Sequence, residues 1–240
     1  MKALTLIAVA ALALGLTGVL QAAEEARVTE PFNGKDLAGW KVKGAEDKSQ
    51  WKVGVAAVDP ENPKLLVCKD GAGDMVNVVG GSHGKGLDMY SEAQWGDCRI
   101  ELEVMVPKGS NSGIYVMGEY EIQVLDSFGK EKVGPGDMGG IYGASPPKVN
   151  ASKAPGEWQK YEIDFRAPRF DAAGSKTANA VFLKVVLNGQ TIHENVEIAK
   201  STGGPLRGKE APTGPIMFQG NHGPVAYRNI KVTPLKAEGK

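Results

Sequence analysis

The segment NSGIYVMGEYEIQVLD, residues 111–126, alternates three polar side chains with three apolar ones. The polar set is Glu119, Glu121 and Gln123, and the apolar set is Tyr120, Ile122 and Val124. On a β-strand, side chains two residues apart share one face, and their Cα atoms lie about 6.6 Å apart. The alternation therefore predicts a strand that packs its apolar set into a core and points its polar set into an open cleft.

A carboxylate pair beside an amide suits two kinds of chemistry. Sugar hydroxyls need both donors and acceptors, and a carboxyl group removed from water can transfer protons. The polar row has no compensating lysine and ends at Asp126. The alternative is an ordinary solvated strand face, which is our interpretation of Glu101 and Glu103. The context favours a site over that alternative.

Two further candidates lie near the C-terminus. In the segment VAYRNIKVTPL, strict alternation places Arg228 on the apolar side that holds Ala226, Ile230 and Val232. A guanidinium on such a side needs a carboxylate partner, so Arg228 is either a structural clamp or a holder of an anion or oxyanion at the rim. His222 lies in a glycine-flanked loop where neither helix nor strand requires it, and is a second candidate.

The elements that must position these residues are predominantly strands. Period-two patterns dominate over 3.6-residue periodicity, in the ranges 98–107, 158–167, 181–198 and 225–235. Asn188-Gly189 predicts a tight hairpin turn within the third range. Thirty-two glycines and fourteen prolines punctuate the chain. Short antiparallel strands of this kind bury their apolar faces by stacking two sheets, so we predict an all-β sandwich.

Other segments carry less regular patterns. Residues 127–157 are rich in Gly, Pro and Lys, and we expect a loop over the site because such long loops commonly bind ligands. The connection 167–180 is interpreted as a longer link between two strands. Cys68 and Cys98 could form a disulfide in an oxidising compartment or remain two free thiols, and the sequence leaves both open.

The N-terminus and the charge balance limit where the protein acts and on what. Residues 1–23 have a lysine, an apolar stretch and terminal alanines, which predicts a cleaved signal peptide and a periplasmic or secreted protein. Residues 24–240 are expected to form a single domain. Twenty-eight basic residues balance twenty-eight acidic ones, so we expect a neutral small-molecule partner and neither nucleic acid nor, after cleavage, a membrane.

Several segments together resemble a known family of secreted bacterial proteins, the 3-keto-disaccharide hydrolase domain. The most specific are NSGIY, YEIQVLD and NHGPVAYRNI, and further matching segments run in family order over nearly the whole mature chain. The resemblance implies a concanavalin A-like jelly-roll sandwich of two antiparallel sheets. It also implies a carbohydrate substrate, a glycoside oxidised at C3.

A ketone at C3 acidifies the C2 hydrogen, so the implied route is proton abstraction, elimination at C1 and addition of water. Such a route needs a base, a stabiliser of the oxygen charge and a proton donor. The resemblance implies Glu121 as base with Glu119 or Asp126 next, and His222 and Arg228 as stabilisers or acid. Asn111, Gln123 and Tyr142 would hold hydroxyls. No cofactor is certain, although Glu121, Asp126 and His222 could hold a divalent metal ion.

Two rival functions fit the same pattern. A lectin-like module would use the same sandwich to bind sugar without catalysis. A retaining glucanase of the laminarinase type would carry Glu-x-Asp-x-Glu on one strand. Here that pattern is replaced by Glu119-x-Glu121-x-Gln123, so the third acid is missing.

Overall fold

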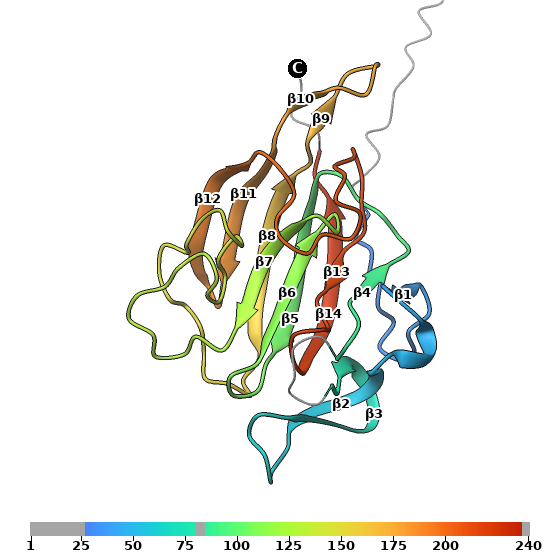
Figure 1. Ribbon diagram of the computed structural model, residues 1–240, viewed down its shortest axis with the longest axis vertical. Coiled ribbons are helices and arrows are strands. Elements are labelled where there is room, and N and C mark those ends of the chain that lie inside the picture. Colours follow the sequence, from blue (N-terminus) through green and yellow to red (C-terminus); the bar gives the residue numbers. More distant parts are fainter. Residues whose placement is uncertain (1–26, 80–84, 237–240) are drawn as a thin grey trace, which may run out of the picture.

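The computed structural model describes residues 27–79 and 85–236, so the predicted signal peptide lies outside the described residues. Two large antiparallel sheets pack face to face (Figure 1), which confirms the predicted all-β jelly-roll sandwich. The helical content of the described residues is one short 3-10 segment, Glu46–Lys48. Within these residues no helix has the length and apolarity needed to cross a membrane.

The larger sheet has seven strands in the order β12-β11-β8-β5-β14-β3-β2. Their bounds are β2 Trp51–Val58, β3 Leu66–Asn77, β5 Cys98–Met105, β8 Gln159–Arg166, β11 Ala180–Leu187, β12 Gln190–Ile198 and β14 Val225–Pro234. β5, up to Val104, and β8 alternate buried side chains with exposed or half-buried ones, as the period-two pattern predicts. Asn188 and Gly189 both adopt positive φ angles between β11 and β12, which confirms the tight hairpin.

The smaller sheet has five strands in the order β1-β4-β13-β6-β7. Their bounds are β1 Trp40–Val42, β4 Met89–Ser91, β6 Asn111–Val116, β7 Tyr120–Leu125 and β13 Met217–Phe218. The connection 167–180 forms a two-stranded ribbon of β9 (Arg169–Phe170) and β10 (Lys176–Ala178). The candidate catalytic segment therefore forms the β6–β7 hairpin at one edge of the smaller sheet.

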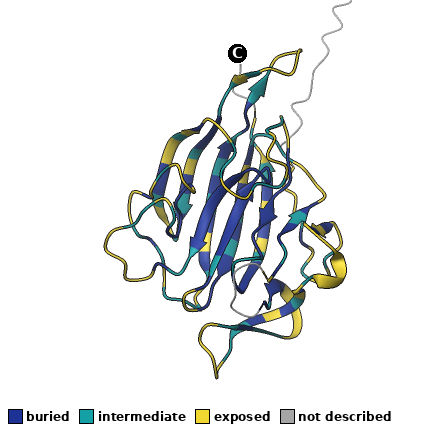
Figure 2. Ribbon diagram, viewed as in Figure 1, coloured by how far each residue is buried: buried dark blue, intermediate teal, exposed yellow. Residues whose placement is uncertain are grey.

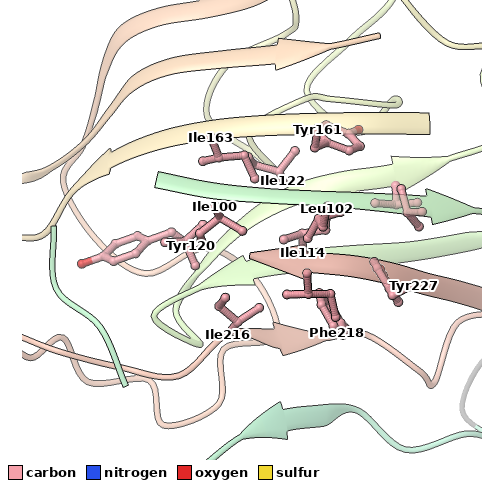
Figure 3. Close-up of a cluster of buried hydrophobic side chains, with 14 of the residues drawn as sticks. Ile100, Leu102, Ile114, Tyr120, Ile122, Tyr161, Ile163, Ile216, Phe218 and Tyr227 are labelled. Carbon is pink, nitrogen blue, oxygen red and sulfur yellow. The ribbon is translucent and has the colours of Figure 1, made fainter. Parts of the chain in front are cut away.

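The core lies between the two sheets. Ile100, Leu102, Tyr161 and Ile163 of the larger sheet meet Ile114, Tyr120, Ile122 and Phe218 of the smaller one (Figure 3). Tyr120, Ile122 and Val124 are completely buried in this cluster, which confirms the orientation predicted for the apolar side of β7. Figure 2 shows the same division, with buried central strands and exposed peripheral loops.

The predicted face of Arg228 is wrong. A register shift between Arg228 and Lys231, with Asn229 at φ 52°, breaks the alternation, so that Ile230 returns to the core and Arg228 does not. The Arg228 guanidinium bonds to Glu103 at 2.7 Å and stacks 3.9 Å over the Trp158 ring. Of the two roles considered, the structure supports the clamp.

The two cysteines are free thiols. Cys98 is buried in the main core, whereas Cys68 packs against a small apolar cluster on the other side of the larger sheet. The disulfide alternative is not realised.

Candidate functional site

A pocket of about 170 Å³ opens on the side of the five-stranded sheet that faces away from the core. Seven of its nine lining residues have polar side chains, and the other two are glycines: Asn111, Tyr115, Glu121, Gln123, Tyr142, Gly203, Gly204, Gln219 and His222. Three strands, β6, β7 and β13 with the residues that follow it, form the floor, and two loops form the walls.

Strand register brings the floor residues together. In the β6–β7 hairpin Tyr115 pairs with Glu121, and Gly113 pairs with Gln123. Cross-strand partners project from the same face of a sheet, with Cβ atoms about 5 Å apart. Gln219 joins them because its backbone N–H donates to the Gly113 carbonyl at 2.9 Å. Glu121 and Gln123 thus share the polar face predicted for them.

Gly113 leaves the space that the Glu121 carboxyl occupies. A Cβ atom on Gly113 would lie 2.1 Å from Oε1 of Glu121, far inside van der Waals contact. The carboxyl group therefore leans across the neighbouring strand, directly over the Gly113 backbone. Any side chain at position 113 would displace it.

Two loops cover the free edge of β7 and meet at the Glu121 backbone. The Tyr142 N–H donates to the Glu121 carbonyl at 3.0 Å, and the Glu121 N–H donates to the Thr202 hydroxyl at 2.9 Å. Gly139 and Gly140 pair with Gln123 on the same edge. The segment 127–157 is thus a loop over the pocket, as predicted, and it delivers Tyr142.

Glu119 lies outside the pocket, in the turn Met117–Glu119 that precedes β7. Its buried carboxyl accepts bonds from the Ser201 hydroxyl at 2.9 Å and the Arg207 N–H at 3.1 Å. The Arg207 guanidinium lies 3.6 Å away. Glu119 therefore anchors the loop that carries Gly203 and Gly204. The prediction that Glu119 faces the cleft is wrong.

Glu121 has an unusual proton affinity. Its side chain is 2 % exposed, and burial raises its pKa from 4.5 to about 8. The charge of Asp88 also raises this pKa, whereas a hydrogen bond with Tyr115 lowers it. A carboxyl group with a pKa near neutrality can both take up and release a proton at physiological pH.

The Tyr115 hydroxyl has two acceptors within reach. It donates to the Gly203 carbonyl at 2.8 Å, and it also lies against the Glu121 carboxyl. A phenol has one proton, so an ionised Glu121 competes with Gly203 for it. Burial and the Glu121 charge raise the Tyr115 pKa, which keeps this hydroxyl protonated.

Gln219 and His222 complete the lining opposite β7. The Gln219 amide N–H donates to the Tyr115 oxygen at 3.3 Å, while its buried Oε1 has no hydrogen-bond partner among the described residues. Such an acceptor is costly to bury unless something donates to it, which a hydroxyl group of a ligand in the pocket would do. His222 Nδ1 hydrogen-bonds the Asn221 side chain.

Comparison with known proteins identifies the family of this chain. Residues 27–233 match the 3-keto-alpha-glucoside-1,2-lyase-like domain family. The chain belongs to this family. No curated protein is significantly similar in sequence.

Solved structures with this fold include three from Parabacteroides distasonis ATCC 8503, each described as a "putative glycosyl hydrolase". The first is 31% identical with a TM-score of 0.65, and the match covers 88% of this chain and 84% of that one. The second is 20% identical with a TM-score of 0.56, covering 87% and 94%. The second likeness shows the shared fold, and the family, together with the first likeness, indicates a carbohydrate-active protein.

In this protein, five of the eight predicted site residues line one pocket: Asn111, Glu121, Gln123, Tyr142 and His222. Gln123 donates to the Asn111 side chain at 2.8 Å, which fixes both amides. The other three lie elsewhere. Glu119 and Arg228 are placed as described above. Asp126 accepts the Gly109 N–H at 2.9 Å and stabilises the turn before β6.

The three residues considered as metal ligands are therefore not brought together, because Asp126 does not line the pocket. Among the residues that the structure describes, no group of three His, Cys, Asp or Glu side chains is arranged to hold a metal ion.

Sequence reasoning missed Tyr115, Gln219, Gly203 and Gly204. Tyr115 could have been found, because it lies on the same side of NSGIYV as Asn111 and Gly113. Gln219 carried a weaker signal, as a polar residue after an apolar strand. The two glycines lie about 80 residues from β7 in sequence and carried no signal, since only folding brings their loop to the strand.

A larger pocket of about 520 Å³ lies on the other sheet and contains none of the predicted site residues. Two of its carboxylates are each neutralised by an arginine. Asp97 pairs with Arg169 at 2.5 Å, and Asp164 pairs with Arg99 at 2.6 Å. The smaller pocket around Glu121 is therefore the better candidate for catalysis.

Proposed function

We propose that this protein cleaves 3-keto-glycosides by elimination and hydration, with Glu121 as the base that removes the C2 proton. The observation that carries the proposal is the buried Glu121 carboxyl, whose pKa of about 8 matches a proton-transfer role. The family membership supports the choice of substrate class, and the neutral, hydrogen-bonding lining of the pocket suits sugar hydroxyls.

The proposed reaction has two stages. Glu121 takes the C2 proton, and the electrons of the C2–H bond pass toward the C3 carbonyl oxygen as an enediolate. These electrons then form the C1–C2 double bond as the C1–O bond to the leaving group breaks, and a proton is delivered to the leaving oxygen. Water next adds its hydroxyl to C1 and gives its remaining proton to the group that protonated the leaving oxygen. Glu121, whose carboxyl proton has exchanged with solvent, protonates C2.

Three neighbouring residues are assigned the two other roles that the reaction needs, which are stabilising the oxygen charge and protonating the leaving group. The Tyr115 hydroxyl and the Gln219 amide N–H are donors beside Glu121 and are suited to a developing oxygen charge. His222 lines the same pocket, and we assign it the role of proton donor to the leaving group. Arg228, held by Glu103 outside the pocket, has no part in this scheme.

The proposal includes export to the periplasm or the medium. The N-terminal sequence, with its apolar stretch and alanines before Glu24, supports it. Intact-mass analysis of protein recovered from the periplasm or medium should give a chain that begins at about Ala23 or Glu24. Recovery of the full-length chain with Met1 would contradict export by this route.

The direct test uses purified mature protein and a 3-keto-disaccharide in deuterated water. Elimination before hydration should place deuterium at C2 of the released sugar, because the hydrogen is lost and regained from solvent. Labelling must exceed that of substrate without enzyme, since a ketone exchanges neighbouring hydrogens unaided. Unlabelled product from an active enzyme would refute the elimination route, and sugar binding without turnover would favour a lectin-like module.

A further inference from the structure

The pocket around Glu121 is too small for a disaccharide. Its volume of about 170 Å³ falls below the ~300–1,000 Å³ typical of small-molecule sites. Its floor is formed by the side chains that surround the proposed base. It therefore suits the one sugar ring that reacts, and a second ring must lie outside it.

A second pocket of about 390 Å³ adjoins the first. The two share Tyr142 and Gly203, and the second extends from there over Ala144 and residues 197–202. Tyr142 packs closely on Gly203, because a Cβ atom on Gly203 would lie 3.0 Å from its ring. The Tyr142 ring thus forms the ridge between the two pockets.

Tyr142 is one of five large hydrophobic side chains that are exposed among the described residues, with 44 % of its surface accessible. Its backbone is nevertheless fixed, since its N–H is bonded to the Glu121 carbonyl. A fixed, exposed aromatic ring offers an apolar face with little loss of conformational freedom on binding. The C–H faces of pyranose rings pack well on such surfaces.

The rest of the second pocket indicates a neutral ligand. Its lining carries one carboxylate, Glu197, and one ammonium, Lys200, so it has no excess charge. Glu197 is already bonded to Asn179 at 2.6 Å. Ala144 and Ala199 are small and leave room beside the Tyr142 ring.

We propose that this second pocket binds the leaving-group sugar of a neutral disaccharide, stacked on Tyr142, while the 3-keto ring occupies the pocket at Glu121. This inference rests on the proposed function and makes Tyr142 a determinant of leaving-group specificity. The wall that forms both pockets is the loop anchored by Glu119, so one buried carboxylate positions both binding surfaces.

The kinetic test compares a 3-keto-disaccharide with the methyl 3-keto-glycoside of the same sugar. Tyr142→Ala should lower kcat/KM for the disaccharide about tenfold more than for the methyl glycoside, the ratio expected for losing one favourable aromatic contact. Tyr142→Phe should restore the wild-type ratio because it keeps the ring. Phe128→Ala, at an exposed aromatic outside both pockets, is the matched control. Equal losses on both substrates, or none, would overturn the inference.

A binding measurement separates this inference from the reaction itself. Calorimetry with the unoxidised disaccharide and its methyl monosaccharide should show tighter binding of the disaccharide by wild type, and Tyr142→Ala should abolish that preference. Absence of the preference in wild type would overturn the second subsite. If the preference is present but no 3-keto-glycoside is turned over, the subsite stands and the proposed reaction fails.

Discussion

The turn and the middle of the β6–β7 hairpin hold two glutamates, two residues apart, that the fold treats in opposite ways. Glu119 and Glu121 are both buried, with exposed fractions of 0 % and 2 %. The Glu119 carboxylate accepts hydrogen bonds from a hydroxyl and a backbone N–H, and a guanidinium lies nearby. Glu121 faces a polar pocket with a phenol beside it and the charge of Asp88 in its field.

Burial alone does not make a carboxylate reactive. A buried carboxylate that is well supplied with donors remains a structural anchor, because its charge is already stabilised. Burial without that compensation raises the pKa, as it does for Glu121, and leaves a group able to exchange protons near neutral pH. The same residue type thus serves as anchor at the turn and as candidate base in the pocket.

The largest effect should come from Glu121→Gln. The amide keeps the shape of the side chain but cannot accept the C2 proton, so turnover of a 3-keto-glycoside should fall by about 10²–10⁴-fold. Binding of the substrate, followed by calorimetry, should change little. Full activity in this variant would exclude Glu121 as the base.

A large effect is also expected from Gly113→Ala. The added methyl group would displace the Glu121 carboxyl by contact at 2.1 Å, and a displacement of this kind can reduce the rate about 100-fold. Gly136→Ala is the matched control, since nothing lies within 4 Å of its Cβ position. Kinetics of both variants would test this, and unchanged activity in Gly113→Ala would mean that the position of the carboxyl is unimportant.

The pH profile should report Glu121 directly. Only the ionised base is active, so kcat/KM should rise about tenfold per pH unit below an inflection near pH 8 and then level. Tyr115→Phe removes the hydrogen bond that lowers this pKa, so it should move the inflection to higher pH. Tyr120→Phe, in the same hairpin but facing the core, should leave it in place.

The free energy of unfolding should also depend on the ionisation of Glu121, but it should fall with rising pH where kcat/KM rises. The pKa of Glu121 is about 8 in the folded protein and near 4.5 when unfolded, so its stabilising contribution is complete below pH 4.5 and is lost as the pH rises through 8. The free energy of unfolding of Glu121→Gln, measured with urea, should therefore increase relative to that of wild type as the pH rises from 4.5 through 8. A constant difference across this pH range would contradict the raised pKa.

The smallest effect on catalysis should come from Glu119→Gln. Loss of the charge weakens the bonds to Ser201 and Arg207, so the free energy of unfolding should fall by about 1–3 kcal/mol. Turnover should fall only a few-fold, because the loop that carries Gly203 and Gly204 is less firmly held. A loss equal to that of Glu121→Gln, in a variant that is still folded, would remove the distinction between the two glutamates.

The sequence by itself determined the sandwich and most of the pocket floor. Period-two alternation defines which face of a strand is buried, so Tyr120, Ile122 and Val124 were predicted correctly, as was the shared face of Glu121 and Gln123. The Asn188-Gly189 hairpin was equally local, because two positive φ angles favour those residue types.

Only the tertiary structure decided where the period-two alternation of a strand ends and which loops face the polar side of β7. The turn at Met117–Glu119 removes Glu119 from the strand, and the bulge at Asn229 returns Ile230 to the core while Arg228 stays on the outer side. Gly118 and Asn229 favour positive φ angles, but these residue types do not by themselves fix where the neighbouring side chains point. The walls of the pocket come from loops near Tyr142 and Gly203 that reach β7 through long-range backbone bonds. The raised pKa of Glu121 depends on that enclosure, because burial is a property of the assembled fold.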